Sequence, residues 1–205
     1  MDRPLVPFGE PPAERADAAR NRVLLLAAAR EMIDELGVEK VTMDGLAERA
    51  GLGKGTVFRR FGTRAGIFRA LLDHDEHALQ ARVLSGPPPL GPGADPVDRL
   101  IAYGRARIDF LVGRHQLARA TLDRKAPIPA AGSPMFSRPH IRMLLTQARL
   151  GVPEVDSLSL QLTSALEGPL LLYLSADPAE DADRTAAGRA LADSWQSLIE
   201  RIARR

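Results

Sequence analysis

The chain has 205 residues, of which 45% are hydrophobic and 26% charged, and its formal net charge is +2. This length allows one large or two small domains with a buried core, and so small a net charge does not by itself indicate a nucleic-acid partner. The absence of cysteine excludes disulfides and thiolate metal ligands. No apolar run approaches the ~20 residues of a membrane span, so we expect a cytoplasmic protein with no membrane contact.

The first elements in chain order are an arm and a helix. Residues 1–20 contain four prolines and little apolar periodicity, which predicts a mobile N-terminal arm. Apolar residues then recur every three or four positions from Asn21 to Leu36, and Gly37 follows as a stop signal. This pattern predicts a first helix that begins at residue 21.

Two short helices are predicted next, joined by a glycine turn. Thr42 is a candidate N-cap for a helix that continues to Ala50, and it can equally serve as a phosphate contact. Gly51 breaks this helix, and a second short helix is predicted over 54–61. Apolar side chains at helical spacing on both segments would lock them at a steep angle, as in a helix–turn–helix.

The remainder of the chain also has helical periodicity. A loop rich in proline and glycine at 85–96 precedes it, and no segment alternates with the two-residue period of a strand. The sequence therefore predicts an all-α protein, with a three-helix helix–turn–helix domain at 21–66 and a helical-bundle domain at 67–205. The predicted helices of the second domain lie at about 96–112, 114–124, 139–150, 156–175 and 179–203.

The segment AGLGKGTVFRRF, residues 50–61, resembles a phosphate-binding loop but does not match one. The P-loop pattern needs a first glycine where this chain has Glu48, and a serine or threonine where it has Gly55. The segment also follows a predicted helix, whereas a P-loop follows a strand. These mismatches favour a DNA-binding helix–turn–helix over a nucleotide site.

Local charge supports this interpretation. Between residues 49 and 72 the chain has six basic residues and no acidic one, although the whole chain carries only +2. Such a local concentration of basic charge is expected at a surface that binds phosphates. The alternative is a solvated basic surface without a partner. The six residues are Arg49, Lys54, Arg59, Arg60, Arg64 and Arg69.

Residues 21 to about 72 resemble the DNA-binding head of the tetracycline-repressor (TetR) family of bacterial transcriptional regulators. The resemblance is carried by the stretch AAREMIDELGVEKVTMDGLAERAGLGKGTVFRRFGTRAGIFRAL, about a quarter of the chain. The sequence departs from the family pattern at three positions. Gly53 stands where serine or threonine is usual, Phe58 where tyrosine is usual, and Arg64 where lysine is usual.

The resemblance implies a ligand-responsive regulator, and most directly a repressor that a small molecule releases from a near-palindromic DNA operator. Phosphate contacts are expected from Thr42, Thr56 and Arg64, and major-groove contacts from Lys54, Gly55, Arg59 and Arg60. Phe58 belongs to the same DNA-binding set, although its ring can also pack into the core. No cofactor is expected apart from an unknown small-molecule effector.

The second domain is expected to form a homodimer and to enclose the effector. Its last two helices present apolar stripes suited to a four-helix dimer interface, formed by Leu162, Leu166, Leu170, Leu191, Trp195, Leu198 and Ile202. Several of these side chains can also face the core of their own chain. The candidate ligand-binding residues are Tyr103, Phe110, Met143, Gln147, Glu167 and Tyr173.

The sequence gives less support to a metal site or to catalysis. The cluster DHDEH at 73–77 has two histidines one helical turn apart, but we interpret it as a solvated helix face and expect no metal site. The sequence contains no motif that pairs a nucleophile with a base, so we do not expect the protein to be an enzyme. A helical enzyme and a scaffold protein without a ligand remain the alternatives to a regulator.

Overall fold

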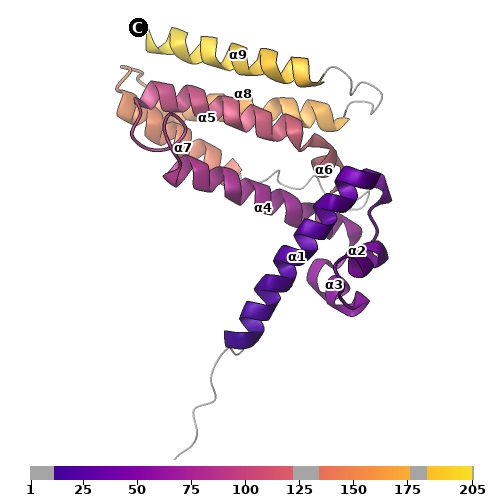
Figure 1. Ribbon diagram of the computed structural model, residues 1–205. Helices are drawn as coiled ribbons and strands as arrows, with labels where there is room; N and C mark the ends of the chain where they lie inside the picture. Colours follow the sequence, from indigo (N-terminus) through magenta and orange to yellow (C-terminus); the bar gives the residue numbers. More distant parts are fainter. Residues whose placement is uncertain (1–11, 122–133, 176–183, 205) are drawn as a thin grey trace, which may run out of the picture. The chain divides into compact units, whose positions relative to one another are not determined.

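The structure is a computed structural model that describes residues 12–121, 134–175 and 184–204, with side chains over 17–121, 136–169 and 185–204. Within these ranges the regular elements are helices and no strand occurs, so the predicted all-α class is confirmed (Figure 1). The chain forms two compact units, Met1–Ala70 (unit 1) and Leu71–Arg205 (unit 2). No helix in the described ranges is long and apolar enough to cross a lipid bilayer.

Unit 1 begins with helix α1, Pro12–Leu36. This helix starts earlier than the predicted residue 21, so residues 12–20 are helical and do not belong to an arm. Proline is well suited to the first helical position, and the alanine, glutamate and arginine residues after it favour a helix. Residues 1–11, the rest of the predicted mobile arm, lie outside the described residues.

The next elements are the 3-10 helix η1 (Val38–Lys40), α2 (Met43–Arg49) and α3 (Lys54–Phe61). Thr42 caps α2, because its hydroxyl accepts a 3.0 Å hydrogen bond from the Gly45 N–H. Gly51 reverses the chain between α2 and α3 with a φ of 63°, a conformation that favours glycine. The turn and both helices lie where the sequence predicted them.

A small apolar core holds these helices together. α2 packs against both α1 and α3, and Leu46, Ala47 and Val57 are buried. Burial of side chains of this size contributes about 1.5–3 kcal/mol each for valine and leucine. Figure 1 shows α2 and α3 as short helices at one end of α1. The other buried apolar side chains of unit 1 include Leu25, Leu26, Ala29, Met32, Val41, Ile67 and Phe68.

The division between the units falls inside helix α4 (Arg64–Ser85), which also contains the boundary predicted after residue 66. The helices that follow are α5 (Pro96–Gly113), α6 (His115–Ala120), α7 (Pro134–Ala148), α8 (Val155–Ser175) and α9 (Arg184–Ala203). Asp95 caps α5 by accepting a 2.8 Å hydrogen bond from the Val97 N–H, as its sequence position before a proline suggests.

Helix α7 begins at Pro134, earlier than the predicted residue 139, and therefore contains Pro139. An internal proline loses one backbone hydrogen bond and costs about 3 kcal/mol. Ile141 and Leu144 in the same helix are fully buried, and burial of two such side chains contributes about 1.5–3 kcal/mol each. Tertiary packing therefore outweighs the local signal that Pro139 gives in the sequence.

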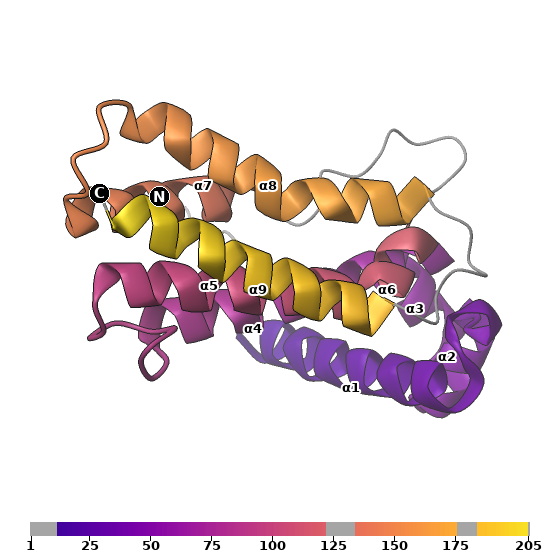
Figure 2. The same cartoon turned by 90° about the horizontal axis from the view of Figure 1, so that it is seen from above.

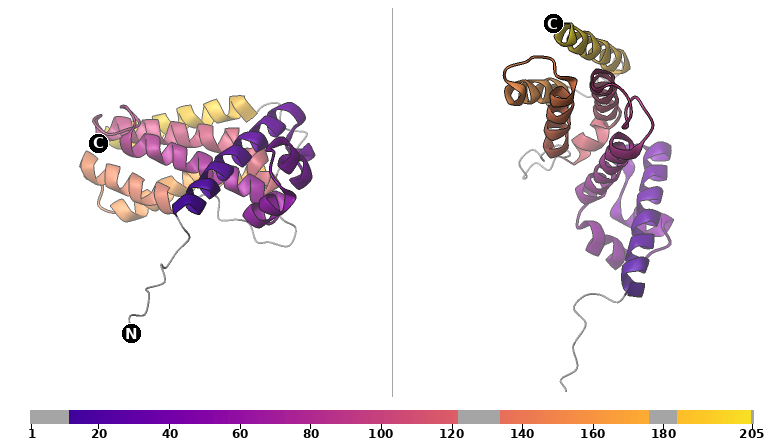
Figure 3. Two further views of the ribbon diagram at one scale, coloured as in Figure 1. Left: turned by 60° about the horizontal axis from the view of Figure 1, so that its bottom comes forward. Right: turned by 90° about the vertical axis from the view of Figure 1, so that its left-hand side faces the viewer.

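Helix α5 is the centre of unit 2. α9 runs along it, and α7 and α8 pack on each other and on α5 (Figures 1 and 2). Figure 3 shows α7 and α8 as a pair of orange helices. The core between these helices includes Leu79, Val83, Leu100, Tyr103, Ile108, Ile141, Leu144, Leu145, Leu162, Leu166, Trp195 and Ile199.

The indole of Trp195 on α9 lies directly against the backbone of α5 at Gly104. The indole Nε1 of Trp195 donates a 3.1 Å hydrogen bond to the carbonyl of Leu100, and it passes directly over Gly104 to do so. A Cβ on Gly104 would lie 2.0 Å from that nitrogen. The absence of a side chain at this position is therefore required for the packing of Trp195.

We expect Gly104→Ala to destabilise unit 2 by about 1–3 kcal/mol, because Trp195 must move and lose its hydrogen bond. Urea unfolding followed by the fluorescence of the single tryptophan measures this loss. Gly113→Ala is the matched control, since a Cβ there meets no atom within 4 Å. Equal midpoints for the two variants would contradict the packing described here.

Candidate nucleic-acid interface

Helix α3 buries one side and exposes the rest. Val57 is fully buried and Phe61 is half-buried, and the local spacing of these apolar residues fixes which side faces the core. The half-buried Thr56 lies at the edge of the exposed side. The exposed residues of α3 are Lys54, Gly55, Phe58, Arg59 and Arg60. All of them belong to the predicted DNA-binding set.

The basic residues near α3 fall into two groups. Arg49 forms a 2.6 Å ion pair with Glu35, and its hydrogen bond lowers the pKa of that carboxyl below the usual value. Lys54 forms a 3.0 Å ion pair with Asp44, and both side chains are well exposed. Exposed pairs of this kind contribute only about 0–1 kcal/mol each, so they hold the side chains loosely.

Arg59 and Arg60 form the second group. Both side chains are exposed, and no acidic residue within the described ranges pairs with either of them. Their charges are therefore available to an external anion, in contrast to those of Arg49 and Lys54. The sequence alone does not show which of these basic residues are paired with acidic ones.

Arg64 has a different environment from the one the sequence suggests. Its Nε donates a 2.7 Å hydrogen bond to the Val41 carbonyl, and a terminal nitrogen donates a 2.6 Å bond to the Val38 carbonyl. The guanidinium also lies 4.9 Å from the ring centroid of Phe68. Arg64 thus fastens η1 and the start of α2 to α4. The predicted phosphate contact has to compete with these bonds and stays a prediction.

The remaining predicted residues of unit 1 are accessible. Thr42 is exposed while it caps α2, so both of its predicted roles are compatible. Phe58 keeps 49% of its surface exposed, which is high for a phenylalanine and places the ring beside the free arginines on the outer side of α3. A Cβ on Gly55 would meet no atom within 4 Å, so the fold itself does not require glycine there.

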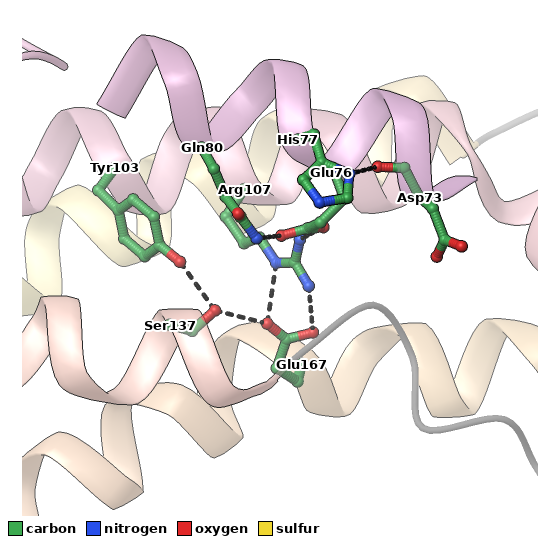
Figure 4. A network of polar contacts seen from close by, with 8 residues as sticks. All are labelled: Asp73, Glu76, His77, Gln80, Tyr103, Arg107, Ser137 and Glu167. Carbon is green, nitrogen blue, oxygen red and sulfur yellow. Dashed lines mark hydrogen bonds and ion pairs between the residues drawn. The ribbon is translucent and has the colours of Figure 1, made fainter. Parts of the chain in front are cut away.

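Unit 2 contains a buried polar network that the sequence did not reveal (Figure 4). Arg107 of α5 is fully buried and forms a 2.5 Å ion pair with Glu76 of α4 and a 2.8 Å pair with Glu167 of α8. The hydroxyl of Tyr103 donates to Ser137, and that of Ser137 donates to Glu167. Breaking such a pair costs about 3–5 kcal/mol, because one buried charge loses its partner.

The pKa values of the network follow from its burial. Burial would lower the pKa of Arg107, but the adjacent carboxylates of Glu167 and Glu76 outweigh it and raise that pKa. Burial raises the pKa of Tyr103 to about 12. The nearby His140 stacks on Phe136 at 5.5 Å, and burial, with a smaller contribution from Arg99, lowers its pKa to about 4. Arg107 is therefore charged and His140 neutral near pH 7.

The structure brings together only part of the predicted ligand-binding set. Tyr103 and Glu167 belong to the polar network, and Phe110 lies 5.2 Å from the Arg107 guanidinium. Met143 and Gln147 are exposed on α7 and take no part in it. The side chain of Tyr173 lies outside the described residues. No sequence motif indicated Arg107, Glu76 or Ser137; their only signal was polarity within apolar helical stripes.

The residues predicted for the dimer interface differ in their burial. Leu162, Leu166 and Trp195 are buried in the core of unit 2, and their role in a dimer interface stays a prediction. Leu198 is 39% exposed, and Leu191 and Ile202 are half-buried. The side chain of Leu170 is not among the described ones. The apolar stripes of α8 and α9 thus contribute to the protomer's own core, and each helix also keeps an exposed leucine, Leu160 on α8 and Leu198 on α9.

The DHDEH cluster is occupied by internal contacts. Asp75 accepts a hydrogen bond of 2.5 Å from Arg114, Glu76 binds Arg107, and the His77 ring contacts the Asp73 carbonyl at 2.6 Å. Over the described ranges, no three potential ligands gather as a metal site would require.

Taken together, the fold and the exposed cations define an all-α helix–turn–helix protein with a separate helical domain. Residues 25–71 match the family described as bacterial regulatory proteins, tetR family. The resemblance of this part of the chain to the TetR family, first seen in the sequence, is confirmed.

Individual relatives extend this result. A helix–turn–helix-type transcriptional regulator of Staphylococcus aureus (strain USA300) is 33% identical over 61 residues, which cover 30% of this chain and 33% of the relative. The similarity thus spans about a third of the length of the curated relatives.

Two solved structures share the fold over most of the chain. A transcriptional regulator from Rhodococcus sp. Rha1 matches with a TM-score of 0.61 and 21% identity, over 89% of this chain and 96% of its own. A putative TetR-family regulator from Mesorhizobium loti matches with a TM-score of 0.56 and 16% identity, over 88% and 97%. These similarities extend the fold assignment to unit 2.

We expect Gly55→Ala to leave the stability of unit 1 unchanged or to raise it by up to about 1 kcal/mol, since alanine favours a helix and has room here. If α3 lies against DNA at this position, the same variant weakens DNA binding. Urea unfolding and a fluorescence-anisotropy titration with duplex DNA measure the two effects. Reduced stability would contradict the open space around Gly55.

Replacement of Arg64 by lysine separates its structural role from its charge. Lysine keeps the charge but cannot reach both carbonyls in the same way, so we expect a loss of about 1–3 kcal/mol in unit 1 stability. Arg69→Lys, at an exposed position on the same helix, is the control and should leave stability unchanged. Unfolding midpoints that are the same for both variants would show that the two carbonyl bonds contribute nothing.

Proposed function

We propose that this protein is a DNA-binding transcriptional regulator that acts as a homodimer. The observation that carries this proposal is the pair of exposed arginines, Arg59 and Arg60, on the second helix of a helix–turn–helix, with no carboxylate bound to either among the described residues. Arginine in this position can bind guanine with two hydrogen bonds in the major groove. The relatives described above are named as transcriptional regulators, which is consistent with this function.

The division of the basic residues supports the same conclusion. Arg49, Lys54 and Arg64 bind groups within unit 1, so their charges first stabilise the fold around α3. Arg59 and Arg60 have no such partner among the described residues, so their charges are available to an external anion. A DNA duplex supplies phosphates and acceptor-rich base edges to both.

Dimerisation follows from the requirements of DNA recognition. One short helix contacts few base pairs, whereas two copies related by a two-fold axis read two half-sites one helical turn apart. The exposed edge of α9, with Leu198, Leu191 and Ile202, is the surface that we assign to the second copy. The expected operator is accordingly a near-palindrome.

Regulation by a small molecule is the finer part of the proposal. Tyr103, Glu167 and the underlying Arg107 supply hydrogen-bonding groups inside an otherwise apolar bundle, as ligand sites commonly do. A ligand that binds best to the conformation with a poor fit to DNA shifts the protein away from its operator. This mechanism makes the protein a repressor that its effector releases.

Selection of bound duplexes from a random DNA library with the full-length protein tests the proposal. We expect enrichment of a near-palindromic sequence and a steep loss of affinity with added salt, because phosphate contacts release counterions. Arg59→Ala should weaken binding to the selected duplex by about 1–3 kcal/mol and relax the preference at one position of each half-site. A library without enrichment, and binding that salt does not change, would refute a DNA-binding function.

The same selected duplex tests the effector. A thermal-shift screen of small molecules, run with and without this duplex, should reveal a compound that stabilises the free protein and weakens the DNA complex. If compounds stabilise the protein and DNA binding is unchanged, unit 2 binds ligands without regulating DNA binding.

A further inference from the structure

An open groove separates the N-terminal part of α1 from α3, and all residues that line it belong to unit 1. It has a volume of about 630 Å³. The α1 side is formed by residues three or four positions apart on one side of the helix, which include Ala18, Asn21 and Arg22, with Leu25 buried at its base. The opposite side is formed by α3, whose polar residues there are Thr56, Arg59 and Arg60.

The charge of this groove is strongly positive. Arg22, Arg59 and Arg60 contribute three guanidinium groups, and within the described ranges no acidic residue pairs with any of them. The single acidic residue of the lining, Asp17, is paired with Arg20, which does not line the groove. A concave surface with charges of one sign concentrates ions of the other sign.

The residue types and the size of the groove indicate what it binds. Arginine, asparagine and threonine side chains are those that contact phosphate oxygens along a DNA backbone. Thr56 and Arg60 are four positions apart and therefore share one side of α3, which faces Arg22 and Asn21 of α1. The groove volume lies within the ~300–1,000 Å³ range of ligand pockets, so the groove is much larger than a single phosphate ion needs.

We propose that this groove holds one sugar–phosphate strand of the bound duplex, so that α1 forms part of the DNA interface. Arg22 and Asn21 contact the phosphates from one side, and Thr56 and Arg60 contact them from the other. Arg60 then positions the strand, while Arg59, which is displaced toward Gly55 on the helix, remains the base-reading arginine. This inference rests on the proposed DNA-binding function and adds a second helix to it.

This proposal gives the N-terminal part of α1 a role in DNA binding. Asp17 and Ala18 lie in the stretch that the sequence suggested was an arm, but they belong to α1 and line the groove. A rigid helix holds Asn21 and Arg22 in fixed positions, and pre-organised contacts lose less conformational entropy on binding than contacts from a flexible segment.

The test measures the salt dependence of binding to a mixed-sequence duplex and to the library-selected duplex. Arg22→Ala removes one phosphate contact, so the slope of log K against log salt should fall by about 0.9, which is roughly an eightfold loss of affinity at 0.1 M salt. Both duplexes should be affected alike, and Arg60→Ala should behave in the same way. Arg59→Ala should instead reduce mainly the affinity for the selected duplex.

A second pair of variants uses the groove wall itself. Ala18→Glu places a negative charge and extra volume inside the groove, and we expect at least a tenfold loss of DNA affinity. Ala27→Glu is the matched control, because Ala27 is exposed on the opposite side of the same helix. Arg82→Ala, which removes an exposed cation from unit 2, controls for net charge. Both controls should bind DNA like the parent.

The outcomes separate this inference from the function on which it rests. Urea unfolding first establishes that Arg22→Ala and Ala18→Glu are folded. If the parent binds DNA with steep salt dependence and either folded variant binds DNA like the parent, the groove does not hold the strand. If the parent itself shows no salt-dependent binding, the proposed function fails instead. Stabilisation by inorganic phosphate that Arg22→Ala abolishes, without a change in DNA binding, would identify a site for a free anion and overturn the proposal.

Discussion

The burial of Val57 fixes the orientation of α3, and the surface chemistry of unit 1 depends on this orientation. With Val57 in the core between α2 and α3, helical geometry leaves Gly55 and Arg59 on the outer side, and Arg60 is exposed at the edge of the buried side. Gly51 sets the turn that brings the two helices into contact, and Thr42 fixes where α2 begins. A few local constraints thus determine which polar groups are offered to a partner.

The cations of unit 1 have two separate physical roles. Arg64 binds two backbone carbonyls and Phe68, and Arg49 binds Glu35, so both contribute to the conformation in which α3 is presented. The guanidinium groups of Arg59 and Arg60 reach solvent. Net charge alone cannot distinguish these roles, because a charge bound to a carboxylate or carbonyl in the fold is less available to a DNA phosphate than a free one.

Local signals predicted unit 1 well, because its structure is specified by caps, glycines and helical spacing within short segments. The bounds of α3 and the turn at Gly51 followed directly from the sequence. The start of α1 did not, because closely spaced prolines suggested an arm, although Pro12 occupies a position that begins a helix. Pro139 misled in the same way, since tertiary burial of its neighbours outweighs its local cost.

Contacts between distant residues could not be predicted. Arg107 meets Glu76 and Glu167 across 31 and 60 positions of the chain, and no periodicity or motif connects residues so far apart. For the same reason the apolar stripes of α8 and α9 did not distinguish a partner surface from the protomer's core, where Leu162, Leu166 and Trp195 lie. Which cations are paired within unit 1 also depends on tertiary geometry alone.

The arrangement of Arg107 between Glu76 and Glu167 restricts how this chain can diverge. Loss of Arg107 leaves two carboxylates without their shared counterion, whereas replacement of all three residues by apolar residues of similar volume removes that penalty. Substitutions at these positions are therefore expected to accumulate jointly in evolution, through intermediates that are less stable than either end point. Homologues of this chain that lack Arg107 should accordingly lack both carboxylates as well.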